Sequence, residues 1–233
     1  HRHYRRQRQM CIRDRSLYFT SNEDISNTDS IPSATILGQT SSIINTESDN
    51  WKADYITTNS DQEGEVDFEI SFFDLAGNKG DLISSSTIDN NSKVIFDRTA
   101  PSDFTLGNIT SLGGNIVVDV WNSTNNNLEV FVPIENDTTL KSGWVQIRAK
   151  IGSNSMEDFG GISEIVDGDV LGDKSLTFSA LEVESITGFN DNETIVFEAI
   201  LYDRPGNQKT GNESLNRLDI DQTPPTINYV SYK

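Results

Sequence analysis

The sequence predicts an all-β protein made of two consecutive β-sandwich domains. Three observations lead to this fold class: short runs in which apolar and polar residues alternate, a pair of motifs that occurs twice, and proline-containing segments after each occurrence. Alternation with a period of two places the apolar side chains on one face of a strand, so that one face is buried and the other is wet. Many short strands separated by turn residues are typical of a sandwich.

Two alternating runs mark strands in the first half of the chain. Trp51, Ala53 and Tyr55 alternate with charged residues, and the run 65–72 alternates in the same way. Residues 16–22 are expected to form the second strand of this domain, whose opening strand we expect to be missing. The first domain is therefore predicted to cover 16–100 and to be truncated at its N-terminus.

The second half contains four further runs of the same kind, at 128–134, 145–151, 176–180 and 195–201. No apolar period of a helix lasts longer than two turns, so we expect no long helix. The second domain is predicted to cover 101–222, with an acidic insertion near 153–173. Residues 223–233 carry Ile227 and Tyr229 in alternation and are expected to be the first strand of a third module.

Each predicted domain closes with the same two motifs. Asp-x-x-Gly-Asn occurs at 74–78 and at 203–207, and Asp-x-Thr-x-Pro follows at 97–101 and at 221–225. Gly and Asn tolerate positive φ, and Asp can bond backbone groups two residues on, so the first motif predicts a hairpin turn. Proline fixes φ and keeps its predecessor extended, so the second motif predicts a linker and places the domain boundaries there.

Residues 1–15 differ from the rest of the chain in composition, since they hold six of its ten arginines. The run RRQRQMCIRD within them resembles the translation of a transposase-derived sequencing adapter. This resemblance implies that residues 1–15 are a non-native tail, which we expect to be disordered. The alternative is a natural arginine-rich tail that binds nucleic acid or a membrane.

The remaining chain is strongly acidic. The formal net charge is -18 for all 233 residues; from Ser16 onward there are 12 basic and 35 acidic residues, which gives -23. Both histidines and the single cysteine lie in the tail, so the rest lacks an imidazole base, a thiol nucleophile and soft zinc ligands. The charge argues against nucleic-acid binding. No stretch is apolar enough to span a bilayer, so membrane insertion is not expected.

The first domain resembles the bacterial Ig-like repeats that occur in arrays in large secreted and surface-attached proteins, including adhesins. The segments that carry the resemblance are 18–23, 51–55 and 73–78. It covers nearly all of 16–100, whereas the second domain matches mainly around 104–122 and 203–207. The resemblance implies tandem Ig-like sandwiches in an extracellular or cell-surface protein. The implied partners are neighbouring modules of the same chain and surface glycans or proteins.

Carboxylates near the predicted turns and linkers are the candidate metal ligands. If turn and linker meet at one end of a domain, their oxygens converge there, and Ca²⁺ would stiffen the junction. The candidates are Asp74, Asp97, Asp203, Asp219 and Asp221. The alternative is that each carboxylate accepts hydrogen bonds within its own turn. In the insertion, Asp167, Asp169 and Asp173 suggest a second cation loop, but the EF-hand spacing is absent.

These observations predict a non-catalytic spacer that presents a distal binding domain, with no catalytic or cofactor-binding residue and Ca²⁺ as the one candidate cofactor. One alternative is a carbohydrate-binding or spacer module of a secreted polysaccharide-degrading enzyme. An exposed aromatic row on one sheet, for which Trp144 is the best candidate, would favour that role. The other alternative is cadherin-like, Ca²⁺-dependent adhesion, which requires ligands from both neighbouring modules at each junction.

Overall fold

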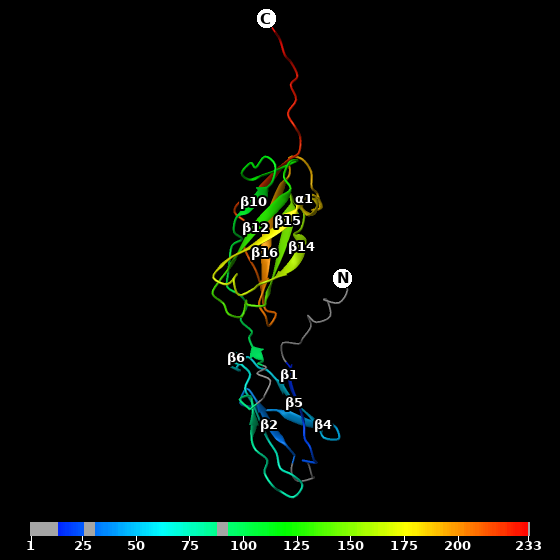
Figure 1. Cartoon of the computed structure of the whole chain (residues 1–233), viewed down its shortest axis with the longest axis vertical. Helices are drawn as coiled ribbons and strands as arrows, with labels where there is room; N and C mark the ends of the chain where they lie inside the picture. The colour runs from blue at the N-terminus through cyan, green and yellow to red at the C-terminus, as the bar shows by residue number, and fades with distance from the viewer. Residues whose placement is uncertain (1–13, 26–30, 88–92, 233) are drawn as a thin grey trace. The chain divides into compact units, whose positions relative to one another are not determined.

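A computed structural model of the chain describes residues 14–25, 31–87 and 93–232. The chain divides into two compact units, His1–Arg98 and Thr99–Lys233, called unit 1 and unit 2 below (Figure 1). The expected non-native tail lies outside the described residues except for its last two positions, Asp14 and Arg15, whose backbone belongs to the first strand.

Unit 1 is a sandwich of two antiparallel sheets. Its first sheet has the order β1–β5–β4, with bounds Asp14–Thr20, Asn50–Ile56 and Ser42–Glu47. Its second sheet has the order β3–β2–β7–β8, with bounds Gln39–Thr40, Ser33–Ile36, Phe68–Ser71 and Ile83–Ser84. A short ladder joins β6 (Gly64–Glu65) to β9 (Ile95–Phe96). Ala34, Ala53 and Ile70 form the buried cluster between the sheets.

Unit 2 repeats this arrangement with longer strands. One sheet has the order β10–β12–β15, with bounds Ile109–Leu112, Asn127–Ile134 and Gly172–Ser179. The other has the order β11–β18–β16–β13–β14, with bounds Val120–Asn122, Leu218–Asp221, Thr194–Tyr202, Trp144–Ile151 and Glu157–Glu164. The short strand β17 (Gln208–Thr210) also pairs with β16. A cluster of 24 buried apolar residues fills the space between the sheets.

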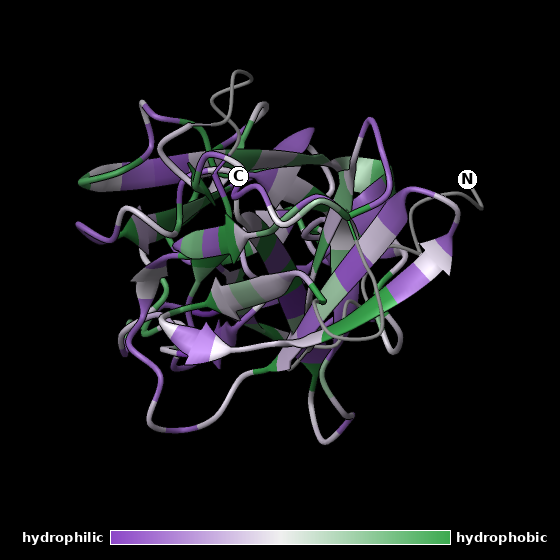
Figure 2. Ribbon diagram, turned by 90° about the horizontal axis from the view of Figure 1, so that it is seen from below, coloured by the Kyte–Doolittle hydropathy of each residue, from purple (hydrophilic) through white to green (hydrophobic). Residues whose placement is uncertain are grey.

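The alternating runs form strands whose apolar side chains face the core. In β12, Leu128, Val130 and Val132 are fully buried, whereas the residues between them are half-buried. Figure 2 shows the same alternation as bands of apolar and polar colour along the strands. The two facing sheets of each unit confirm the predicted all-β, Ig-like sandwich fold.

The structure adds a short helix that the alternation does not indicate. Ala180 was expected at the end of a strand face, but it begins α1 (Ala180–Glu184). Ser179 caps this helix: its side chain accepts a bond from the Glu182 N–H, and the Glu182 carboxylate accepts from the Ser179 N–H. This reciprocal capping box satisfies two helix-end donors and ends the strand there. The region 153–173, expected to be an acidic insertion, contains strand β14.

The two units share a common strand plan. β1 pairs with β5 in unit 1 as β12 pairs with β15 in unit 2, and β2 pairs with β7 as β13 pairs with β16. The units differ at the edge of β1, and of its counterpart β12, that faces away from β5 or β15. β10 covers the outer edge of β12, whereas in the described part of the chain no strand other than β5 pairs with β1.

Candidate functional site

The two Asp-x-x-Gly-Asn motifs form the same closed turn in both units. In unit 1 the Asn78 N–H donates to Asp74 Oδ1 at 2.8 Å, and Asn78 Nδ2 donates to Oδ2 at 2.7 Å. In unit 2 the Asn207 N–H donates to Asp203 Oδ1 at 2.7 Å, and Asn207 Nδ2 donates to Oδ2 at 2.8 Å. Both oxygens of each carboxylate therefore accept hydrogen bonds from the asparagine that closes the turn.

The two turns differ in burial. Asp74 is half-buried, and the residues that follow it in the turn, 75–79, are exposed. The Asn78 side chain that donates to Asp74 holds the pKa of its carboxyl below the ordinary value. Asp203 is completely buried, because the loop 137–143 lies over its turn. There the Arg204 N–H donates to the Thr139 carbonyl at 2.8 Å. Gly143 packs so closely that a Cβ on it would lie 2.1 Å from the Tyr202 carbonyl oxygen.

The remaining metal candidates lie at the end of each unit. Asp97 follows β9 and is buried. Asp219 lies in β18 opposite Thr194, whose hydroxyl donates to its Oδ1 at 2.7 Å. Asp221 ends β18 and accepts a 3.3 Å bond from the Thr223 N–H.

Within unit 2 the turn and the final strand lie at opposite ends of β16. Asp219 stands beside Thr194, the first residue of β16, whereas Asp203 follows Tyr202, the last one. A nine-residue strand is about 30 Å long, so Asp203 and Asp219 cannot share one cation within the unit. Across the described ranges, no three Asp, Glu, His or Cys side chains are grouped closely enough to hold a metal ion. A Ca²⁺ site formed between two modules stays a prediction.

Sequence reasoning missed the acidic residue that holds the end of unit 2. Asp191, in the loop before β16, accepts the Gln222 N–H on Oδ1 at 2.6 Å and the Thr223 hydroxyl on Oδ2 at 2.6 Å. The Thr223 hydroxyl, together with the Gln222 N–H, holds the pKa of the Asp191 carboxyl below its ordinary value. The carboxylate thus fastens the chain where it leaves the last strand.

Unit 1 has the same kind of fastening. Glu63, directly before β6, accepts the Arg98 N–H on Oε1 at 3.0 Å and the Arg98 Nε–H at 3.3 Å. The Arg98 guanidinium also donates to the carbonyls of Thr58 and Asp61, each at 3.2 Å. We call this contact, and that of Asp191 in unit 2, the chain-end anchors. In both anchors, an acidic residue that precedes the Asp-x-x-Gly-Asn turn and its strand accepts the backbone N–H of the residue after Asp97 or Asp221.

The two loops that hold the anchoring carboxylates share a short sequence pattern, Asp-x-Glu. Asp61-Gln-Glu63 and Asp191-Asn-Glu193 stand at the same place in the two units, yet the anchoring carboxylate is the second acid in unit 1 and the first in unit 2. Asp61 instead ties its own loop, accepting the Thr58 N–H at 2.5 Å and the Tyr55 hydroxyl at 2.9 Å. The Thr58 N–H is the main reason that the pKa of the Asp61 carboxyl is lowered.

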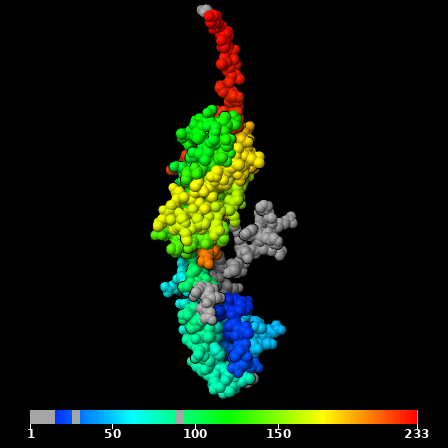
Figure 3. Space-filling view, in the orientation of Figure 1, coloured from blue at the N-terminus to red at the C-terminus, as the bar shows by residue number. Residues whose placement is uncertain are grey.

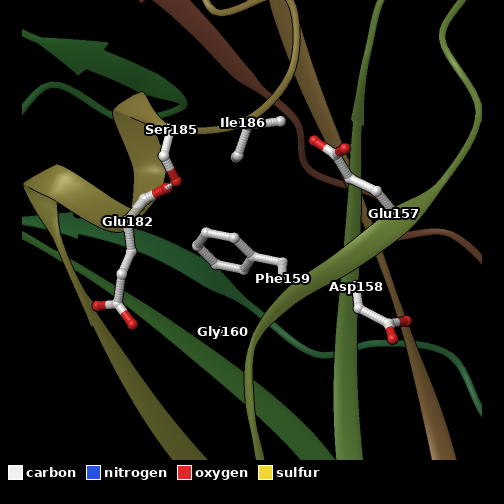
Figure 4. A pocket seen from close by; sticks show the side chains of 7 residues that line it. All are labelled: Glu157, Asp158, Phe159, Gly160, Glu182, Ser185 and Ile186. Carbon is white, nitrogen blue, oxygen red and sulfur yellow. Dashed lines mark hydrogen bonds between the residues drawn. The ribbon is translucent and has the colours of Figure 1, made fainter.

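An acidic hollow of about 200 Å³ lies between β14 and α1 (Figure 4). In Figure 4 the Phe159 ring lies between the side chains of Glu182 and Glu157. The Glu157 carboxylate accepts the N–H and the hydroxyl of Thr187, at 2.7 and 2.9 Å. Glu182 takes part in the α1 capping box, and Asp158 lies 3.7 Å from the Arg148 guanidinium. Its acids are therefore engaged in local structural contacts.

The acids expected to form a second cation loop are also placed by the structure. Asp167 pairs with Lys141 at 2.7 Å, and Asp169 pairs with Lys174 at 2.8 Å. Asp173 lies in β15 opposite Pro133. Asp167 and Asp169 thus face separate lysines.

The tryptophans do not form an aromatic platform. Trp51 and Trp121 are buried, and Trp144 is half-buried at the start of β13. Among the described residues, the exposed aromatic side chains are those of Tyr18, Phe73, Tyr229 and Tyr232. They lie in β1, in the unit 1 turn and in the C-terminal segment, so they make no row on one sheet.

Comparisons with known proteins add a distant structural likeness. No protein-family model matches the chain, and no curated protein matches it. A crystal structure of the FN1–FN3 domains of chicken CNTN1 matches with 12% sequence identity and a TM-score of 0.31, covering 93% of this chain. The chain spans 64% of the length of that structure. Within the described ranges, no helix has the length and apolarity needed to cross a bilayer. The fold assignment rests on the two facing sheets of each unit.

Proposed function

We propose that this chain is a non-catalytic segment of a bacterial cell-surface or secreted protein, in which Ig-like modules act as a spacer that presents a distal binding domain. The observation that carries this proposal is the chain-end anchor, which occurs in both units. A spacer is loaded along the chain, so the residues where the chain leaves each module bear the load. Carboxylates that bind backbone N–H groups at those points make charge-assisted bonds, which are stronger than neutral ones.

The pairing of the final strand of unit 2 suits a strand that carries tension along the chain. β18 pairs on one side with β16 and on the other with β11, in parallel register from Val120↔Asp219 to Asn122↔Asp221. The Gln222 side chain adds a 3.3 Å bond to the Trp121 carbonyl. Because ladder bonds run across the strands, a pull along β18 loads them together.

Single-molecule force spectroscopy on the chain, held at its two ends, tests the proposal. We expect unit 2 to unfold in one event that releases about 120 residues, or roughly 430 Å of contour length. Asp191→Ala should lower the unfolding force of that event, because it removes the acceptor of Gln222 and Thr223. The matched control is Asp167→Ala, which removes an exposed acid paired only with Lys141. A spacer role would be contradicted if unit 2 unfolds in several steps and Asp191→Ala leaves the unfolding forces unchanged.

A further inference from the structure

Strand β10 shows what a complete first sheet requires in this fold. It pairs antiparallel with the outer edge of β12, from Ile109↔Val130 to Leu112↔Asn127. Around its start, the Gly107 N–H donates to the Phe131 carbonyl at 2.8 Å. With this edge covered, Leu128 and Val130 of β12 are fully buried.

The equivalent edge in unit 1 has no such cover among the described strands. β1 pairs with β5 on one side, and no second described strand pairs with it. Its core-facing side chains, Leu17 and Phe19, are only half-buried, and Tyr18 on the opposite face is 69% exposed. An unpaired strand edge beside incompletely covered apolar side chains is a template for a further strand.

The chain itself carries a segment of the matching kind. Residues 99–112, which include β10, come after the last strand of unit 1, and residues 223–232 come after the last strand of unit 2. Each segment begins within an Asp-x-Thr-x-Pro motif. The second segment is extended and exposed along its whole length (Figure 3). Its apolar side chains are open to solvent, with Ile227 83% and Tyr229 81% exposed.

The composition of this C-terminal segment also fits strand pairing. Residues 226–232 read TINYVSY, in which β-branched and aromatic residues of high strand propensity predominate. Residues 223–232 contain no charge, so the segment itself adds nothing to the repulsion between two chains that each carry a net charge of -18. Its ten residues span about 33 Å when extended, enough to cover a seven-residue strand.

We propose that residues 223–232 of one molecule add as an antiparallel strand to the outer edge of β1 in a second copy of this chain. Main-chain bonds to β1 supply the affinity, and Ile227 and Tyr229 pack beside Leu17 and Phe19 as β10 residues pack beside β12. Donor and acceptor are different surfaces, so the contact is heterologous and links molecules head to tail. This pairing does not depend on the spacer role.

Sedimentation velocity of the full chain over a range of concentrations tests the proposal. We expect the weight-average mass to rise above that of the monomer as concentration increases, and to return to the monomer value in the double variant Ile227→Lys, Tyr229→Lys. Both residues are exposed on the C-terminal segment, so the variant leaves the two units folded. A monomer at every concentration, or assembly that persists in the double variant, would overturn the proposal.

A synthetic peptide with the sequence of residues 223–233 locates the acceptor. Added in excess, it should suppress assembly and slow amide hydrogen exchange in residues 14–20, whereas a peptide with both lysine replacements should do neither. Exchange in β1 that the peptide leaves unchanged would overturn β1 as the acceptor. If, without added peptide, the β1 amides of the chain exchange slowly at every dilution, the strand that covers β1 does not come from a second copy, and the proposal is overturned.

Discussion

Units 1 and 2 share a strand plan, a closing turn and a chain-end anchor, yet they differ in how much apolar surface they bury. The buried cluster of unit 2 has 24 residues, and that of unit 1 has three among its described residues. The features that the two units share with their common strand arrangement are therefore the closing turns, the chain-end anchors and the apolar–polar alternation. The stability of the sandwich depends on how completely the space between the sheets is filled.

The central strands show the difference at single positions. Phe197 of β16 and Phe68 of β7 each precede a glutamate and lie six residues before the turn aspartate. Phe197 is fully buried, whereas Phe68 is half-buried at the rim of its cluster. A phenylalanine at equivalent places in the two units therefore contributes differently to the stability of each unit, because its surroundings differ.

The largest effect is expected from shortening these phenylalanines. Phe197→Ala should lower the free energy of unfolding of unit 2 by about 4 kcal/mol, the usual cost of such a cavity. Phe68→Ala should cost unit 1 clearly less, since Phe68 already contacts solvent. Denaturant titration followed by tryptophan fluorescence measures both, with Trp51 in unit 1 and Trp121 and Trp144 in unit 2. Equal losses in the two units would contradict the proposed difference in filling.

The turn aspartates give the next largest effect. Asp203→Ala removes a fully buried carboxylate that three donors of Gly206 and Asn207 bind, and should cost unit 2 about 3 kcal/mol. Asp74→Ala removes the two bonds from Asn78 at a half-buried carboxylate whose turn neighbours are exposed, so water replaces them and the effect on unit 1 should be much smaller. The same denaturant titration applies. A loss from Asp74→Ala as large as that from Asp203→Ala would show that burial does not set the contribution.

A smaller, pH-dependent effect is expected at the chain-end anchor of unit 2. The pKa of Asp191 is lower in the folded state than its ordinary value of 3.8, so ionised Asp191 stabilises the fold. This contribution is complete above pH 3.8 and is lost as the pH falls through the lower folded pKa. Asp191→Ala should lower the melting temperature by a few degrees at pH 7, and the difference should shrink in acid. A difference of constant size down to pH 2 would rule out the carboxylate as its source.

The smallest effect is expected from calcium. A ligand at a hundredfold excess over its Kd stabilises a folded protein by about 2.7 kcal/mol. Asp74 and Asp203 already accept bonds from Asn78 and Asn207 on both oxygens, so we expect the melting temperatures with Ca²⁺ and with chelator to agree. A rise of several degrees that Asp97→Asn or Asp221→Asn abolishes would instead establish a junction site.

Alternation and turn chemistry predicted several of the long strands and both closing turns, whereas β14 lies in the region expected to be an insertion and β2 and β4 lie in no predicted run. The run 195–201 became the centre of β16, and Asp-x-x-Gly-Asn became a closed turn in both units. The helix α1 was missed because five residues are too short for a helical period, although Ser179-x-x-Glu182 is a capping-box signature.

The chain-end anchors and the burial of Asp203 depend on contacts between distant parts of the chain. Asp191 lies 31 residues from Gln222, and Glu63 lies 35 residues from Arg98. Asp203 is buried by a loop around Thr139 that comes just before β13, the strand next to β16 in the sheet. Local patterns carry no information on such contacts, so they appear only when the strands are assembled.

The parallel pairing of β11 with β18 also fixes the order in which unit 2 can be completed. About a hundred residues separate the two strands, so a ribosome adding ~5–20 residues per second makes β18 roughly 5–20 s after β11. Until β18 is made, Trp121 lacks its neighbour Ile220, and Thr194 of β16 lacks its partner Asp219. Synthesis of the last strand therefore closes the module, and a chain that stops before Leu218 leaves β11 and the start of β16 without their partner strand.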